Sequence, residues 1–590
     1  MKCFVPIVFT ILMIHPSSVS DAQSAFSFGS PGQEYGKAAA VDQEGNAVIA
    51  ALFQGTIAPH PASPVRLTSV GGVDMVLAKY APDGDLIWAI SVGGPQSTDV
   101  PHAVAYDKQG NIVVAGYFGL PGPGGRTCDF DPGPGERTLV SAGGYDAFVA
   151  KYSAGGALLW TRRIANATDT TEDRAWDLTI DSEGRIHVTG AFSGRIDIGD
   201  GVSAEASGSD IELFIASYSA NGDPIRVVTV PVNMLNVFTE AYAAVDADSE
   251  GNLWLAGNFR GDVDFDPGTG TALLQSRGMT DMFLARYDAG DGSFEWVGQM
   301  GGSGQDIISP GAMRVDDRGR PALTGRLRGT ADLSPTGGSM VTGTLFLAAY
   351  DTEGALRFGF VVPGASQNSG GHRVAFDEAG NVYVAGWVGG APDFDTGSGS
   401  MIRPASGTQD VFLAKYSEGG NVLWANVLGA PGNTGNDICA GLAVDAGGNA
   451  WITGQFYGIG ADYDPSEKAF LLSSVGMNDC FVAKYSPDGS LWSSATSVAL
   501  PTDAQSLRIL SVAPSPVRSQ GMVTFTSDRA RDLDIVVFDL LGREVLRREL
   551  GLLDAGGHRL ALPFNSLPSG TYIISLQSDL ATQQMLITVL

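Results

Sequence analysis

Pairs of aspartates separated by one residue recur in this sequence, and each pair precedes a turn-forming segment. Because alternate residues of an extended segment point to one side, the carboxylates of a pair lie close together. Calcium prefers about six to eight oxygen ligands of this kind. The copies read CDFDPGPG (128–135), VDFDPGTG (263–270), PDFDTGSG (392–399) and ADYDPSE (461–467). The candidate calcium ligands are Asp129, Asp131, Asp262, Asp264, Asp266, Asp393, Asp395, Asp462 and Asp464.

The same pattern has a second interpretation, in which each aspartate accepts hydrogen bonds from nearby backbone N–H groups and stabilises the turn. The spacing matches no established calcium loop, and this favours the turn interpretation. Weaker copies occur at 195–201 and 330–337. No other cofactor is expected.

Motifs for nucleophilic or metal catalysis are not found elsewhere. The sequence has no GxSxG elbow, no phosphate-binding glycine loop, no CxxC and no HExxH. His102, His187 and His372 fall in or beside strands of different repeats, without the spacing of metal ligands. We therefore predict no catalytic residue, although a site assembled from distant repeats would escape this search.

The elements that carry these residues are set by two alternating phrases, each present seven times. The first is typified by YDKQGNIVVAG (106–116), and its glycines recur at intervals of 61 to 74 residues. The second is typified by FVAKYSAGGALLW (148–160). A near-constant period of this length is typical of repeat architectures.

Each phrase reads as a β-hairpin, because apolar and β-branched flanks surround a centre of Asp, Asn and Gly. Two hairpins per period give four antiparallel strands, and seven periods predict an all-β, seven-bladed β-propeller over 25–497. Asp42 and Asp445 represent a turn aspartate present in every repeat, so we expect a structural role for it. The recurring tryptophans are expected to pack between blades; they are Trp88, Trp160, Trp296, Trp424 and Trp492.

These alternating phrases resemble the bacterial β-propeller repeats called SBBP. The resemblance covers almost the whole chain before its last hundred residues. It implies the propeller fold but indicates little about function, because the family mostly has no assigned activity.

The start of the repeat region suggests how the ring closes. FSFGSPGQEYG (26–36) is similar to segments that follow the fourth strand elsewhere, such as ISVGGPQSTD (90–99). We expect Phe26–Gly29 to add an edge strand to the last blade, which would join the last blade to the first. The alternative is a disordered leader.

The last residues form a second domain. After a linker at 498–506, residues 507–590 show about seven short strands and predict a small Ig-like β-sandwich. SVAPSP (511–516), IVVFDLLGREVL (535–546) and LPSGTYIISL (567–576) resemble the type A sorting domain of the type IX secretion system. The resemblance implies interaction with that machinery and export to the cell surface.

Composition is consistent with export. A Lys and an apolar run near the N-terminus predict a signal peptide at 1–22, and no other run is long enough to span a membrane. The net charge of −28 argues against nucleic acid as a partner. Of the three cysteines outside the signal, Cys439 and Cys480 either form a disulfide or, like Cys128, are buried thiols.

Two functions remain at this point. The first is a secreted or cell-surface, non-enzymatic binding or scaffold protein for extracellular glycan or protein. The second is an extracellular polysaccharide-active enzyme, recognisable by two or more carboxylates that converge with an Arg, His or Tyr at one end of the propeller channel. In both cases we expect the site on the face of the long connections or in the channel mouth.

Overall fold

In the computed structural model of the chain, the described residues are 24–120, 125–166, 172–207, 211–234, 241–430, 432, 435–466, 468–493, 507–513, 520–527, 530–539, 543–554, 556–565, 567–578 and 582–589. All elements in them are strands, so the all-β expectation is confirmed. The chain divides into two compact units, 1–494 and 495–590. The predicted signal peptide and linker, 1–22 and 498–506, lie outside the described residues.

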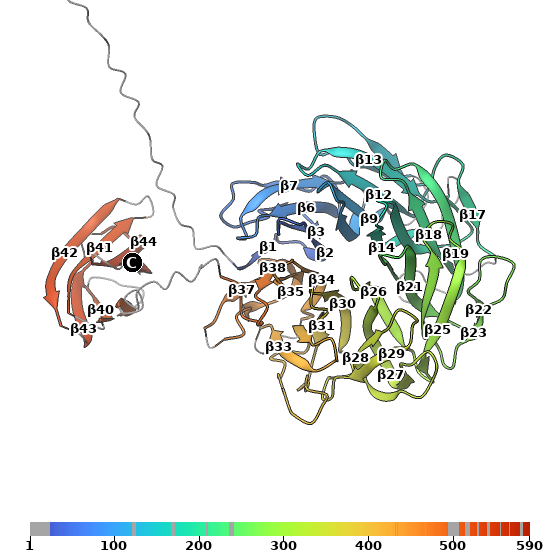
Figure 1. Ribbon diagram of the computed structural model, residues 1–590. Coiled ribbons are helices and arrows are strands. Elements are labelled where there is room, and N and C mark those ends of the chain that lie inside the picture. The colour runs from blue at the N-terminus through green and yellow to red at the C-terminus, as the bar shows by residue number, and fades with distance from the viewer. Residues whose placement is uncertain are drawn as a thin grey trace, which may run out of the picture. The chain divides into compact units, whose positions relative to one another are not determined.

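Seven sets of four antiparallel strands make up most of the described part of the first unit (Figure 1). Sets 1 to 3 are β2(Tyr35–Val41), β3(Ala47–Phe53), β6(Asp74–Tyr80), β7(Leu86–Val92); β8(Val100–Tyr106), β9(Ile112–Gly119), β12(Tyr145–Tyr152), β13(Leu158–Ile164); and β14(Arg174–Ile180), β15(Ile186–Phe192), β18(Ile211–Tyr218), β19(Pro224–Met234). Sets 4 and 5 are β20(Ala243–Ala247), β21(Asn252–Phe259), β24(Asp281–Asp288), β25(Phe294–Gly302); and β26(Ile307–Val315), β27(Pro321–Asp332), β28(Met340–Tyr350), β29(Leu356–Val361). Sets 6 and 7 are β30(Gly370–Phe376), β31(Val382–Val388), β32(Asp410–Tyr416), β33(Val422–Leu428); and β34(Ile438–Val444), β35(Ala450–Phe456), β38(Asp479–Tyr485), β1(Ala25–Phe28).

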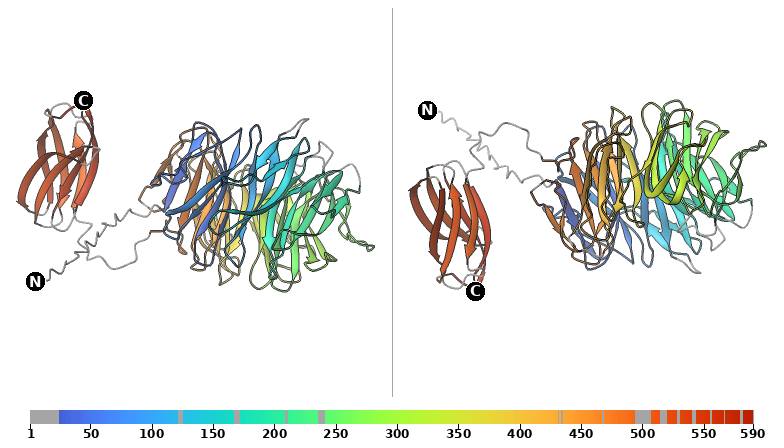
Figure 2. Two further views of the ribbon diagram at one scale, coloured as in Figure 1. Left: turned by 90° about the horizontal axis from the view of Figure 1, so that it is seen from above. Right: turned by 90° about the horizontal axis from the view of Figure 1, so that it is seen from below.

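Neighbouring sets are joined mainly by side-chain packing. A short pairing of β25 with β27 merges sets 4 and 5 into one eight-stranded sheet, and every sheet is open at its edges. The first strands contact one another in the order β2, β8, β14, β20, β26, β30, β34, and β34 contacts β2. Seven hydrophobic clusters each combine residues of two consecutive sets, including set 7 with set 1. Figure 2 shows the strands of this unit running between its two faces.

The repeated glycines explain why the hairpins recur. The glycine of the first phrase has a positive φ in all seven copies, from 76° at Gly110 to 96° at Gly251. The glycine of the second phrase often has a further role, because a Cβ at Gly222 would lie 2.5 Å from the Trp160 ring of the preceding set. Trp88 and Trp424 contact the equivalent turn glycine in the same way. The expected packing of these tryptophans between sets is confirmed.

Set 7 takes its fourth strand from the other end of the first unit. β1 pairs antiparallel with β38, from Ala25 opposite Ala483 to Phe28 opposite Cys480. The expected edge strand at Phe26–Gly29 is therefore confirmed. One expectation is wrong: in the described residues, the seventh copy of the second phrase forms no second strand, and only a bridge joins Tyr485 to Leu491. β1 occupies the edge of β38 on which that strand would pair.

The connections between second and third strands contain small ribbons that the sequence did not indicate. These ribbons are β4(Thr56–Ile57) with β5(Leu67–Thr68), β10(Thr127–Asp129) with β11(Thr138–Val140), β16(Arg195–Asp197) with β17(Ser203–Glu205), β22(Asp262–Asp264) with β23(Leu273–Gln275), and β36(Ile459–Asp462) with β37(Leu471–Ser473). They carry most of the recurring aspartate pairs on ordered backbone.

Cys128, Cys439 and Cys480, the cysteines among the described residues, are free and buried. β35 lies between β34 and β38, which carry Cys439 and Cys480, and the two side chains belong to different hydrophobic clusters. The buried-thiol interpretation is therefore confirmed, and the disulfide is not formed.

The second unit has two antiparallel sheets around one hydrophobic cluster that includes Phe525, Ile535 and Ile574. The three-stranded sheet is β39(Leu507–Ala513), β40(Gln520–Ser527), β43(Gly556–Pro563), and the four-stranded sheet is β42(Glu544–Leu553), β41(Arg531–Asp539), β44(Gly570–Gln577), β45(Thr582–Val589). Such a pair of sheets is what the alternation of apolar residues predicts.

Candidate functional site

The first strands of five sets carry a β-bulge at an equivalent place. In set 1 the register with β3 shifts between Gly36 and Ala38, and sets 2, 3, 6 and 7 show the same shift. A bulge gives one residue no direct partner and redirects its side chain. The bulged residues are Lys37, His102, Trp176, His372 and Ala440, and all five line one cavity.

This cavity has a volume of about 510 Å³ and lies where the first strands begin and the second strands end. It is therefore on the side of the long connections, at the position where we expected a site. Its cationic or imidazole residues are Lys37, His102, Arg174, Arg326 and His372, and its aromatic residues are Tyr117, Trp176, Tyr242 and Trp387. None of the described residues that line it is Asp or Glu. We call it the cationic cavity.

Aromatic rings hold the polar groups of the cationic cavity in place. The Arg174 guanidinium lies 4.1 Å from the Tyr117 ring centre and 4.6 Å from that of Tyr145. The His102 ring meets Trp176 edge-on at 4.8 Å, and Trp176 meets Tyr242 at 5.4 Å. These contacts fix the rings and the guanidinium before any ligand arrives, which lowers the entropic cost of binding.

Burial lowers the pKa of every base in the cavity, and neighbouring cations lower it further for all of them except Arg174. Burial lowers the pKa of Lys37 to about 8, helped by Arg373 and Arg174. Burial also lowers the pKa of Arg174 and of Arg326. The pKa values of His102 and His372 fall well below the usual value, mainly through burial and then through neighbouring cations, so both rings are neutral at pH 7.

Arg373 connects the bulged residues across the centre of the unit. It follows His372 on β30, and its Nε donates to the Ala440 carbonyl at 2.8 Å. Its Nη2 donates to the carbonyls of Lys37 and His102, at 3.2 and 3.1 Å, and its Nη1 donates to the carbonyl of Pro310. The side chain is 5 % exposed. One guanidinium thus satisfies carbonyls from four other sets and fixes the backbone that shapes the cavity.

A second cavity, of about 470 Å³, lies at the opposite ends of the first strands. Here Arg314 donates to both carboxylate oxygens of Asp177, at 2.7 and 3.1 Å. Asp246 accepts from Thr179 Oγ1, Val315 N and Ala247 N, while burial raises its pKa. Two carboxylates therefore do converge with an arginine, the feature named above for an enzyme, but their oxygens already accept bonds from the protein.

The aspartates bond to backbone. Three of the four segments that carry them lie at the small ribbons, and the fourth, at 392–399, has only an isolated bridge between Asp393 and Ile402. Asp264 Oδ1 accepts from Asp266 N at 3.2 Å and from Ala272 N at 2.7 Å, and Asp266 Oδ1 accepts from Gly268 N at 2.7 Å. Equivalent bonds are made by Asp129, Asp131, Asp393, Asp395, Asp462 and Asp464. Asp262, the ninth candidate, is exposed at the start of β22. These contacts fit the turn interpretation, and the calcium interpretation stays a prediction.

The residue between the paired aspartates has a packing role that the sequence did not reveal. Phe265 is 1 % exposed, and its carbonyl accepts a 3.0 Å bond from Tyr287 Oη of the neighbouring third strand. The same tyrosine-to-carbonyl bond joins Tyr152 to Phe130, Tyr416 to Phe394, and Tyr485 to Tyr463. In these sets the tyrosine of the second phrase thus anchors the segment that carries the aspartate pair.

Removal of one such hydroxyl provides a test. We expect Tyr287→Phe to lower the free energy of unfolding by about 1–2 kcal/mol, because the buried Phe265 carbonyl loses its donor. Tyr218→Phe is the matched control, because Tyr218 Oη has no hydrogen-bond partner among the described residues. Urea unfolding followed by tryptophan fluorescence measures both. Equal losses of unfolding free energy in the two variants would show that the Tyr287 hydroxyl does not anchor the ribbon.

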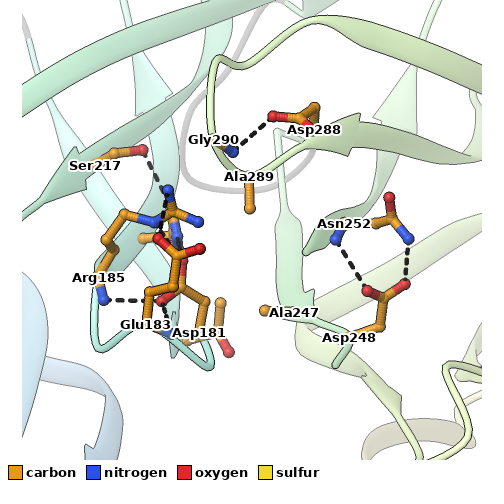
Figure 3. A network of polar contacts seen from close by, with 12 residues as sticks. Asp181, Glu183, Arg185, Ser217, Ala247, Asp248, Asn252, Asp288, Ala289 and Gly290 are labelled. Atoms are coloured by element: carbon orange, nitrogen blue, oxygen red, sulfur yellow. Dashed lines mark hydrogen bonds and ion pairs between the residues drawn. The ribbon is translucent and has the colours of Figure 1, made fainter. Parts of the chain in front are cut away.

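The turn aspartate of the first phrase links hairpins, as expected for a structural role. Asp107 forms a 2.8 Å ion pair with Lys151, and Lys151 Nζ also donates to the Ala220 carbonyl of the next set. Figure 3 shows the corresponding aspartates of sets 3 and 4, Asp181 and Asp248, with their own turns.

Set 3 replaces the lysine by Ser217, and the result looks like a catalytic triad. His187 Nδ1 lies 2.9 Å from Ser217 Oγ, and its Nε2 lies 3.0 Å from Asp181 Oδ2. His187 and Ser217 are 0 % exposed, so no substrate reaches the hydroxyl. Burial lowers the pKa of His187 despite Asp181. This arrangement takes the place of the Asp–Lys pair of sets 1, 2, 6 and 7.

Comparison with known families concerns the second unit. Residues 511–589 match the model of the secretion system C-terminal sorting domain. The tail is a type IX sorting domain. The sorting domain indicates secretion to the cell surface or the extracellular space, and it implies interaction with the type IX secretion machinery. No described residue lies in a helix long and apolar enough to cross a membrane.

Similarities outside the sorting domain are distant. An uncharacterized WD repeat-containing protein of Acanthamoeba polyphaga mimivirus is 24 % identical over 486 residues, 70 % of this chain, and the chain matches 34 % of that protein's length. Solved structures include a fungal AA5 alcohol oxidase with copper (13 % identity, 96 % and 98 % covered, TM-score 0.33). They also include PorZ, a surface component of the type IX system of Porphyromonas gingivalis (12 %, 96 % and 100 %, TM-score 0.15). At these TM-scores neither structure bears on the function of the chain.

Proposed function

We propose that the first unit is a seven-bladed β-propeller of SBBP-type repeats, and that it acts as a non-enzymatic binding module outside the cell, delivered by the sorting domain. Seven four-stranded sets, the contacts that lead from β2 through β34 back to β2, and the joining of set 7 by β1 support the propeller. In this arrangement, the bulged first strands line the channel at the centre of the propeller.

The observation that carries the binding role is the composition of the cationic cavity. The five bulged residues are of four types, with His at two of them, although all five occupy an equivalent position in their sets. A structural position would repeat with the fold, whereas a recognition surface needs different side chains at each point of the ligand. Fixed aromatic rings beside hydrogen-bond donors are typical of sites that bind sugars, so extracellular glycan is the proposed ligand.

A glycan array probed with the mature protein tests this proposal, with and without chelator. We expect binding that Trp387→Ala weakens by about tenfold or more, since one aromatic contact contributes on the order of 1 kcal/mol beyond its buried area. Tyr457→Ala is the control, because Tyr457 is an exposed aromatic residue outside the cavity. Silence on every glycan would argue against glycan binding, and dependence on chelator would favour the calcium interpretation.

The enzyme alternative rests on Asp246 and Arg314, which line the second cavity, and on Asp177, which pairs with Arg314. For a glycosidase, one carboxyl group would protonate the leaving oxygen and the other would act as base or nucleophile. The bidentate pair of Asp177 with Arg314 and the three bonds to Asp246 leave neither group free in this way. Release of reducing sugar by wild type, lost in Asp246→Asn, would favour the enzyme.

A further inference from the structure

We propose that the ligand of the cationic cavity is an acidic saccharide, whose carboxylate is bound by Arg174, Arg326 and Lys37. This inference rests on the proposed glycan-binding function and adds the chemical class of the sugar. The three cations come from β14, β27 and β2, which belong to different sets, and they face one space of about 510 Å³. No described lining residue is acidic, although the protein has 64 acidic residues against 36 Lys and Arg.

Two buried polar groups of this cavity lack a hydrogen-bond partner among the described residues. Arg174, by contrast, forms an ion pair with Glu172, whose carboxylate lies 3.6 Å from Arg174 Nη2 and outside the cavity lining. The buried Nε of Arg326 and Nδ1 of His372 have no hydrogen-bond partner among the described residues. Buried donors without partners are costly and rare, so groups gathered in one cavity point to a ligand that satisfies them.

The surroundings of the cations favour a sugar acid over other anions. Trp176, Trp387 and Tyr242 supply rings on which the C–H face of a pyranose packs, and His102 and His372 are neutral ring donors or acceptors for hydroxyl groups. An inorganic phosphate would pair with the cations but would make no contact with the rings of Trp176, Trp387 and Tyr242. The planar guanidinium of Arg174, packed against two tyrosine rings, matches the two oxygens of a carboxylate.

The test is calorimetric titration of the full mature protein with a uronic acid oligosaccharide and with its carboxyl-reduced, neutral counterpart. We expect the neutral sugar to bind at least about tenfold more weakly, the scale of one charge-assisted hydrogen bond. Arg174→Gln and, independently, Arg326→Gln should each weaken binding of the acidic sugar by a similar factor. Arg318→Gln is the control, because Arg318 is exposed, pairs with Glu418 and lies outside the cavity.

Dependence on pH gives a further readout. Lys37 faces Arg373, Arg174, His102 and His372, and it loses its charge as the pH rises through about 8. Affinity for the acidic sugar should therefore fall between pH 7 and pH 9 in wild type and stay level in Lys37→Gln. Affinity that does not change over this range in wild type would remove Lys37 from the site.

The outcomes separate the two proposals. Equal affinity for the acidic and the neutral sugar overturns the inference while glycan binding stands. Failure of every saccharide, acidic or neutral, overturns both, and so does binding of an acidic peptide when no sugar binds. Acidic-sugar binding that both arginine variants retain places the ligand elsewhere on the protein and overturns the inference alone.

Discussion

Deletion of residues 24–30 will lower the melting temperature of the first unit more than any other change of similar size. β1 places Phe26 and Phe28, each 3 % exposed, in the hydrophobic cluster that joins set 7 to set 1. Loss of a buried phenylalanine side chain costs about 3–5 kcal/mol, so the two together contribute roughly 6–10 kcal/mol. The deletion also exposes the edge of β38, which then favours pairing with another chain.

Point substitutions separate this effect from a general consequence of shortening the chain. Phe26→Ala combined with Phe28→Ala should reproduce most of the loss, whereas Ser27→Ala, on the opposite side of the same strand, should leave stability nearly unchanged. Differential scanning calorimetry and size-exclusion chromatography measure melting and self-association. An unchanged melting temperature after the deletion would show that β1 does not lock the two ends of the unit.

Arg373→Met is expected to have the second largest effect, a loss of about 3 kcal/mol or more in the free energy of unfolding. The substitution leaves the carbonyls of Ala440, Lys37 and His102 without their donor, and each buried acceptor without a partner costs about 1–3 kcal/mol. Methionine keeps the length of the side chain, so little of the loss comes from a cavity. Chemical denaturation at pH 7, where the guanidinium is charged, measures the effect.

The control for Arg373 is another arginine in a polar contact. Arg318 is 54 % exposed in its pair with Glu418, and Arg318→Met should cost little, because exposed ion pairs contribute about 0–1 kcal/mol. Equal free energies of unfolding for Arg373→Met and Arg318→Met would show that the hydrogen bonds from Arg373 to the bulged strands contribute nothing to stability.

The strands of the first unit could be predicted well because each hairpin pattern occurs seven times in the sequence. The turn glycine of the first phrase adopts a similar positive φ in every copy, so the same residue type recurs at each turn. The fourth strand of the last set was predicted from its similarity to segments elsewhere in the chain. The small ribbons were not predicted, because strands of two or three residues such as β22 have too few positions to show an alternation.

The cationic cavity could not be predicted in the same way. His102 and His372 stand 270 positions apart and belong to no motif, and only the circular order of contacts brings them together. A signal does exist: the bulge lies at an equivalent place in five first strands, and the residues there are Lys37, His102, Trp176, His372 and Ala440. The position of these residues in the repeat, and not a shared residue type, marks the site. The aspartate pairs, which do repeat, proved to bond to their own turns.

The bulge also makes the choice of the ligand-facing side chain independent of how the strands pair. Since the hydrogen-bonded ladder resumes on both sides of the extra residue, its side chain can be exchanged without a change in how the strands pair. Each of the five bulged sets therefore offers one side chain that can be exchanged while the strand pairing stays the same. Combinatorial libraries that vary only the bulged positions would yield new ligand preferences with little risk to folding. Natural duplication and divergence of the repeats would have varied the same positions.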